Sequence, residues 1–201
     1  MLRSFSEVVM LEIPEGSLLI TVGLPGSWKS PVTEEIARMK GFSVIRSDIV
    51  RLEVLKGLDI FENRIASDPE NRKRVYDEMF RQAAEALKDP TRGLILDATF
   101  ITQALRSRAA ELAERADRTF VIAQCVCTEE KSIERILRRT KENYESNALT
   151  REAYLNNKAL FEPVDIKDLK NRFGTVRMIH FIVDTEADSL RAWKVTMIEE
   201  N

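Results

Sequence analysis

Short apolar runs alternate along the chain with longer segments that carry the spacing of amphipathic helices. The apolar runs, which predict buried strands, cover residues 17–22, 42–45, 93–96, 119–126 and 177–183, with residues 8–13 as a candidate edge strand. The helical segments cover residues 31–40, 47–56, 69–88, 102–116, 129–141, 150–160 and 187–199. Strands that alternate with helices predict an α/β fold with a mostly parallel sheet of about five strands.

Composition narrows the class of protein. A chain of 201 residues is long enough for one domain, and its 31 basic and 33 acidic residues leave a net charge of −2. This balance excludes a strongly basic nucleic-acid binder, and no apolar run approaches the ~20 residues of a membrane span. Residues 1–7 do not read as the start of a signal peptide. With Cys125 and Cys127 expected as reduced thiols, we predict a cytoplasmic protein without a membrane partner.

The first strong motif follows the predicted strand at residues 17–22. The sequence GLPGSWKS at residues 23–30 matches the P-loop pattern G-x-x-x-x-G-K-[ST] except at Trp28, which replaces the last glycine. In such a loop, backbone N–H groups and a helix N-terminus surround phosphate oxygens. The lysine reaches the outer phosphates and the next hydroxyl binds Mg²⁺. We therefore predict that nucleotide phosphates are bound by Gly23, Pro25, Gly26, Ser27, Trp28, Lys29 and Ser30.

Trp28 is the departure that bears most on activity. A side chain at this place either crowds the nucleotide and forces a backbone conformation that glycine prefers, or points away and packs elsewhere. The sequence leaves both interpretations open. Pro31 removes an N–H group that has no helical partner in the first turn of a helix.

Charged residues follow the next two predicted strands, at the sheet edge where α/β proteins bind ligands. Asp48 and Arg51 are one helical turn apart, so a carboxylate and a guanidinium share one helix face. In a phosphoryl-transfer site the carboxylate accepts the proton of an attacking hydroxyl and the arginine holds the acceptor or a phosphate oxygen. Asp97 ends an apolar strand in the Walker B manner and is predicted to support Mg²⁺ together with Ser30.

Arginines are frequent in the later helices. Arg135, Arg138 and Arg139 lie partly on one helix face, where they either close over a nucleotide or pair with nearby acidic residues at the surface. We expect Arg72, Lys73 and Arg74 to be solvated surface, and Arg106 and Arg108 to lie near the active edge.

The order of these motifs resembles the small P-loop kinases of the polynucleotide-kinase, zeta-toxin and seryl-tRNA(Sec)-kinase type, often labelled AAA-type predicted kinases. The matching pieces are GLPGSWKS at 23–30, SDIVR at 47–51, LILDATF at 94–100 and ERILRRT at 134–140, and their order covers almost the whole chain. The resemblance implies a single P-loop kinase-like domain over residues 1–201, built as a three-layer sandwich with an arginine-bearing helical lid at about 128–162. Phe100 stands where the family often has Asn.

By this resemblance the protein is a kinase that uses ATP, or another nucleoside triphosphate, and Mg²⁺. Asp48 is the general base, Arg51 binds the acceptor or a phosphate, Lys29 serves the γ-phosphate, and Arg135 and Arg139 reach the nucleotide from the lid. The near-neutral charge favours a small hydroxyl-bearing acceptor over a polynucleotide. The alternative is a nucleotide-binding regulatory module, or a nucleoside triphosphatase, in which Trp28 has reduced or ended kinase activity.

Overall fold

The computed structural model describes residues 2–139 and 148–200, and its centre is one seven-stranded sheet. The strands are β1 (Arg3–Ser4), β2 (Leu18–Val22), β3 (Ser43–Arg46), β4 (Leu94–Asp97), β5 (Phe120–Val126), β6 (Met178–Asp184) and β7 (Lys194–Glu200). Their order is β1-β7-β6-β5-β2-β4-β3, and the five strands from β6 to β3 are parallel. The predicted parallel sheet is confirmed, and β7 and β1 extend it in antiparallel orientation.

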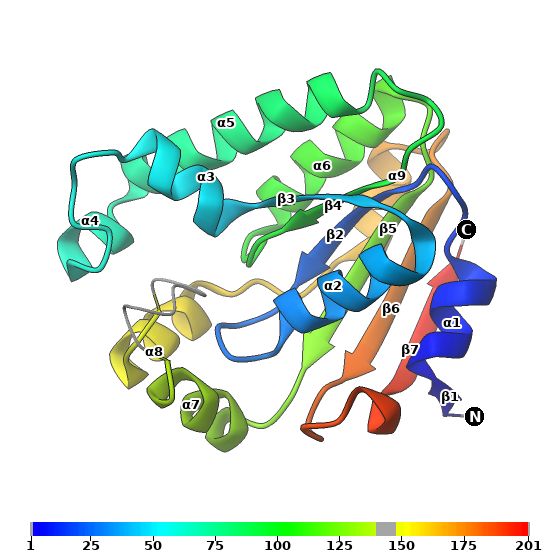
Figure 1. The fold of residues 1–201 in the computed structure, drawn as a ribbon. Coiled ribbons are helices and arrows are strands. Elements are labelled where there is room, and N and C mark those ends of the chain that lie inside the picture. The colour runs from blue at the N-terminus through cyan, green and yellow to red at the C-terminus, as the bar shows by residue number, and fades with distance from the viewer. Residues whose placement is uncertain (1, 140–147, 201) are drawn as a thin grey trace.

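Helices cover both faces of this sheet (Figure 1). The α-helices of the described residues are α1 (Phe5–Glu12), α2 (Lys29–Lys40), α3 (Ser47–Val54), α4 (Asn63–Ser67), α5 (Pro69–Ala86), α6 (Gln103–Arg115), α7 (Glu129–Leu137), α8 (Arg151–Leu160) and α9 (Ile166–Arg172). One hydrophobic core lies between the sheet and α5, α6 and α9, and a second lies between the sheet and α1 and α2. The fold is therefore a three-layer α/β sandwich of the P-loop NTPase type.

The central strand β2 shows why the middle layer is so apolar. All five of its residues are buried, and successive side chains enter opposite cores: Leu18 and Ile20 face α5 and α6, while Leu19 faces α1 and α2. A strand that is covered on both faces cannot alternate apolar with polar residues. The continuous apolar runs of the sequence thus mark parallel strands of the sheet interior.

Two sequence predictions are wrong, both near the chain ends. Residues 8–12 belong to helix α1 and not to an edge strand, because Phe5, Val8 and Val9 have helical spacing and are buried, and Ser4 caps the helix through the Glu7 N–H group. Residues 187–199 do not form one α-helix: a 3-10 helix at Leu190–Ala192 is followed by strand β7. This strand pairs with the open edge of β6. Its conformation is therefore determined by the neighbouring strand and not by the local sequence.

Helices α3, α4, α7 and α8 gather beyond the C-terminal ends of the parallel strands (Figure 1). The predicted lid at about 128–162 contains α7 and α8, while its residues 140–147 lie outside the described residues. The short helix α9 was not predicted; it begins after Asp165, whose carboxylate accepts from the Asp168 N–H group. Among the helices of the described ranges, none is long and apolar enough to cross a membrane.

Candidate active site

A cavity of about 1010 Å³ opens at the C-terminal ends of the parallel strands. It is bordered by the loop before α2, the β3–α3 junction, the β4–α6 junction, the start of α5, and α8. Most of the predicted site residues line it, namely Pro25, Gly26, Trp28, Lys29, Ser30, Asp48, Arg51, Asp97 and Arg139. Gly23, Ser27 and Arg135 are outside its lining. The fold thus brings together side chains that are far apart in the sequence.

The P-loop backbone follows a path that requires glycine, most clearly at Gly26. Gly26 has φ 81°, and a Cβ atom built there would lie 2.3 Å from the carbonyl oxygen of Ser132 on α7. Because backbone cannot yield at that distance, α7 packs against the loop only over a glycine. Helix α2 begins directly after the loop, with no side-chain cap on its first N–H groups. These N–H groups are free to receive an anion at the helix N-terminus.

Trp28 keeps the loop conformation that a glycine would adopt. Its φ of 57° and ψ of 36° are left-handed, which costs a non-glycine residue roughly 1–2 kcal/mol. The ring centroid lies 3.9 Å from the Arg135 guanidinium carbon and 5.9 Å from the Trp193 ring centroid. The indole therefore packs into the contact between the loop, α7 and the second core, although the residue also borders the cavity.

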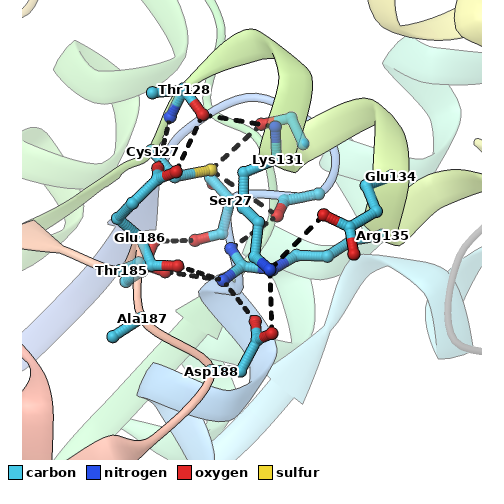
Figure 2. A network of polar contacts seen from close by, with 12 residues as sticks. Ser27, Cys127, Thr128, Lys131, Glu134, Arg135, Thr185, Glu186, Ala187 and Asp188 are labelled. Carbon is cyan, nitrogen blue, oxygen red and sulfur yellow. Dashed lines mark hydrogen bonds and ion pairs between the residues drawn. The ribbon is translucent and has the colours of Figure 1, made fainter.

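Arg135 links the loop to the segment after β6 (Figure 2). Its side chain is only 4% exposed and donates to the carbonyl of Gly26 at 3.3 Å, the carbonyl of Thr185 at 2.7 Å and the carboxylate of Asp188 at 3.0 Å. Lys131 also pairs with Asp188, at 2.8 Å. Both terminal nitrogens of Arg135 thus donate to other groups of the protein. Arg139, in contrast, lines the cavity, and it donates to the carbonyl of Ala148 at 3.3 Å.

Asp48 and Arg51 lie on α3, which begins where β3 ends. Burial raises the pKa of Asp48 to about 6; Asp97 adds to this, while Arg51 and Lys29 oppose it. Arg51 is 9% exposed, and its Nε and Nη1 atoms have no hydrogen-bond partner among the described residues. A carboxylate with a pKa near neutrality and a guanidinium with unused donors therefore share one cavity wall.

Lys29, Ser30 and Asp97 also line the cavity. The Lys29 ammonium donates to the Leu24 carbonyl at 2.9 Å, and burial lowers its pKa. Sheet register places Thr21 and Arg46 beside Asp97: the Thr21 hydroxyl donates to it at 3.1 Å and Arg46 Nε lies 3.5 Å away. Asp97 is 5% exposed, so its remaining oxygen capacity faces the cavity that Ser30 also lines.

These oxygen donors fit a magnesium ion in part. Ser30 and Asp97 offer the hard oxygen atoms that Mg²⁺ prefers. Within residues 2–139 and 148–200, no group of three or more His, Cys, Asp and Glu side chains could hold a metal ion. A Mg²⁺ ion here would take its other ligands from phosphate oxygens and water.

Two site residues were missed by the sequence predictions. Arg72, expected as solvated surface, is half-buried and lines the cavity; Arg74 is exposed as predicted. Tyr76 also lines the cavity, and its hydroxyl accepts from the Phe100 N–H group at 3.1 Å. Both lie on α5 next to the buried Val75, and their four-residue spacing places them on one face. The four-residue spacing of Arg72 and Tyr76 was the sequence feature that could have identified them as site residues.

Arg106 and Arg108 have different surroundings, although both lie near the start of α6. Arg106 is fully buried and donates to backbone carbonyls, including those of Phe100 at 2.9 Å and Glu162 at 2.7 Å. Arg108 lines the cavity, pairs with Asp77 at 2.7 Å and lies over the Phe80 ring. The first is part of the framework, and the second belongs to the cavity wall.

The fold and the strand–loop–helix arrangement define a P-loop NTPase-like domain. A model of the AAA domain family matches residues 18–164. The chain therefore belongs to the AAA domain family, and the matched residues include the P-loop, α3, the end of β4, and α7.

Solved structures share the fold at low sequence identity. A candidate kinase from Chloroflexus aurantiacus J-10-fl matches with a TM-score of 0.62 and 18% identity, over 86% of this chain and 90% of the other. A gluconokinase from Sinorhizobium meliloti 1021 matches with a TM-score of 0.56 and 16% identity, over 89% and 87%. A chain of the PezAT chromosomal toxin-antitoxin system of Streptococcus pneumoniae matches with a TM-score of 0.59 and 12% identity, over 92% and 72%. No curated protein matches the chain in sequence. The fold thus resembles those of small kinases.

Proposed function

We propose that this protein is a Mg²⁺-dependent kinase that transfers the γ-phosphate of ATP, or another nucleoside triphosphate, to a hydroxyl of a small molecule. The observation that carries the proposal is the shared cavity: Lys29, Ser30, Asp48, Arg51 and Asp97 all line it. Membership of the AAA domain family and the kinase-like fold support the same class of reaction.

In this proposal Asp48 is the general base. With a pKa near 6, its carboxylate is mostly ionised at neutral pH and still basic enough to take a proton. As the acceptor oxygen attacks the γ-phosphorus, its O–H proton passes to Asp48. The bond to the bridging oxygen breaks, and the nucleoside diphosphate leaves with that electron pair. Arg51 orients the acceptor from the same helix.

The P-loop side stabilises the phosphate charge. Lys29 would exchange its contact with the Leu24 carbonyl for a phosphate oxygen, and the N–H groups at the start of α2 would bind the same group. Ser30 and Asp97 would hold Mg²⁺, which supplies charge neutralisation when bound. We assign Arg139 to the nucleotide, since it lines the cavity. Arg135 becomes a positioning residue that acts through Gly26 and Trp28.

The test begins with radiolabelled ATP and a panel of sugars, hydroxy acids, nucleosides and short oligonucleotides. For any acceptor that is phosphorylated, Asp48→Asn should lower transfer by at least 10²-fold while calorimetry shows nucleotide binding within about 3-fold of the original. Asp117→Asn is the matched control, because Asp117 is exposed at a left-handed position that Asn also tolerates. Retained transfer in Asp48→Asn would remove Asp48 from the proposed role.

The competing function is a nucleotide-binding module without transfer. The observation that favours it is Trp28, which borders the cavity where the loop pattern has glycine. This alternative predicts that ATP binds and that no member of the acceptor panel is phosphorylated.

A further inference from the structure

Two arginines from different helices line the cavity. Arg51 lies on α3 and Arg72 on α5, two helices that pack against each other. Arg51 is 9% exposed and has two N–H-bearing nitrogens, Nε and Nη1, with no hydrogen-bond partner in the described part of the chain. A buried donor without a partner is unfavourable, so Arg51 is suited to bind a ligand that supplies the missing acceptors.

The Arg51 and Arg72 side chains on this wall are both positively charged. Burial lowers the pKa of Arg72, and the positive charge of Arg51 lowers it further, which means that the two guanidinium groups are close enough to repel each other. Lys73 and Arg108 also line the cavity, and both are paired with Asp77.

Some of the acidic residues that line the cavity interact with other groups of the protein. Asp97 accepts from Thr21 and lies beside Arg46, and Glu162 accepts from the Gln103 N–H group. Asp48, which lies closest to Arg51 in sequence, is the base of the proposed reaction. Arg51 and Arg72 together therefore place two positive charges on this wall, and Arg51 keeps two donor nitrogens without a hydrogen-bond partner among the described residues.

We propose, on the basis of the proposed function, that the acceptor carries an oxyanion group, a carboxylate or a phosphate, which Arg51 and Arg72 bind while the acceptor hydroxyl reaches Asp48. A guanidinium presents parallel N–H groups that match two oxygens of such a group. The anion would satisfy the unused donors of Arg51 and cancel its repulsion with Arg72. Arg72 is thus a specificity-determining residue, supplied by α5 and not by the D-x-x-R motif.

The experiment compares three probes that share a carbon skeleton: glycerol, glycerate and glycerol 3-phosphate. We expect kcat/KM for at least one charged probe to exceed that for glycerol by 10²-fold or more. Arg72→Gln should reduce this preference by 10–100-fold, mainly through KM, with little change for glycerol. Arg81→Gln is the control, because Arg81 is exposed on the same helix and pairs with Glu78. The probe with the larger effect identifies carboxylate or phosphate. Equal use of neutral and charged probes, or an equal loss for both in Arg72→Gln, would overturn the proposal.

A binding measurement separates this inference from the proposed function. With the P-loop saturated by Mg²⁺ and a non-hydrolysable ATP analogue, the charged probes should raise the melting temperature and glycerol should not, and Arg72→Gln should abolish the difference. If this binding occurs without any transfer, the proposed function fails and the anion site stands. If transfer occurs only to neutral acceptors, the function stands and the anion site fails. If Arg72→Gln does not fold, Arg72→Lys takes its place and should keep partial preference.

Discussion

The backbone at residue 28 combines two opposing effects. The left-handed conformation of Trp28 is unfavourable for any side chain, yet its indole is held between the Arg135 guanidinium and Trp193. Cation–π contact and burial of a large ring contribute together more than the roughly 1–2 kcal/mol of backbone strain. The Trp28 side chain therefore packs the loop against its neighbours. The loop still lines the cavity although Trp28 stands at the position where the P-loop pattern has glycine.

Trp28→Gly should therefore destabilise the protein, by about 2 kcal/mol in urea unfolding, because relief of strain does not compensate for the lost ring contacts. Calorimetry should show ATP binding weakened by about 10-fold, since the loop would no longer be held in one geometry before binding. Trp28→Phe is the comparison, and it should lose less on both measures. Tighter ATP binding by Trp28→Gly would instead show that the indole crowds the nucleotide.

Asp48 makes stability depend on pH in a particular direction. Its pKa in the folded protein is about 6, above the ordinary 3.8, so the folded state favours the neutral carboxyl. The contribution of Asp48 to the free energy of unfolding is fully present below pH 3.8 and is lost as the pH rises through 6. Asp48→Asn should consequently raise the free energy of unfolding by about 1–3 kcal/mol at pH 7.5 and by almost nothing at pH 3.5. Denaturant unfolding at both pH values checks this, and a gain that is the same at both would contradict the assignment.

At the scale of elements, α6 holds two loops together at the cavity. Arg106 donates to the carbonyls of Phe100 and Ile101 before this helix and to those of Glu162 and Pro163 between α8 and α9. One fully buried side chain thus fixes the β4–α6 junction against the segment that follows α8. Without this residue four backbone acceptors would lose a charged donor.

Arg106→Met keeps most of the side-chain volume and removes every donor. We expect the free energy of unfolding to fall by about 3–5 kcal/mol, because buried carbonyl groups are left without partners. Arg115→Met on the same helix is the control: its side chain is exposed and pairs with Glu111, so its effect should stay within about 0.5 kcal/mol. Similar losses in the two variants would show that Arg106 has no special role.

At the scale of the whole molecule, ligand binding and folding are coupled through the cavity. Several separated stretches of chain meet there, so a nucleotide that binds only the folded state stabilises all of them at once. At 100 times its dissociation constant, Mg²⁺-ATP should add about 2.7 kcal/mol, which for a chain of this size raises the melting temperature by roughly 5–10 °C. Lys29→Met should lose most of this shift, and Lys88→Met, which removes an exposed lysine paired with Glu85, should retain it.

Local patterns were enough to predict the parallel strands, the P-loop and the position of Asp48, Arg51 and Asp97 along one cavity. The reason is physical: strands buried on both faces need continuous apolar runs, and residues that follow parallel strands reach the same sheet edge. These features depend on residues that are neighbours in sequence, or on the common direction of the strands.

Other features depended on partners far away in the chain. Strand β7 forms because β6 has an open edge, and Arg135 is buried because Thr185 and Asp188 lie across from it. Arg72 enters the cavity because α5 packs beside α3. An arginine on a helix has the same local sequence signal whether it faces water, a carbonyl group or a ligand. Only the tertiary structure decides between these, because burial and the identity of the facing group determine which interactions the guanidinium makes.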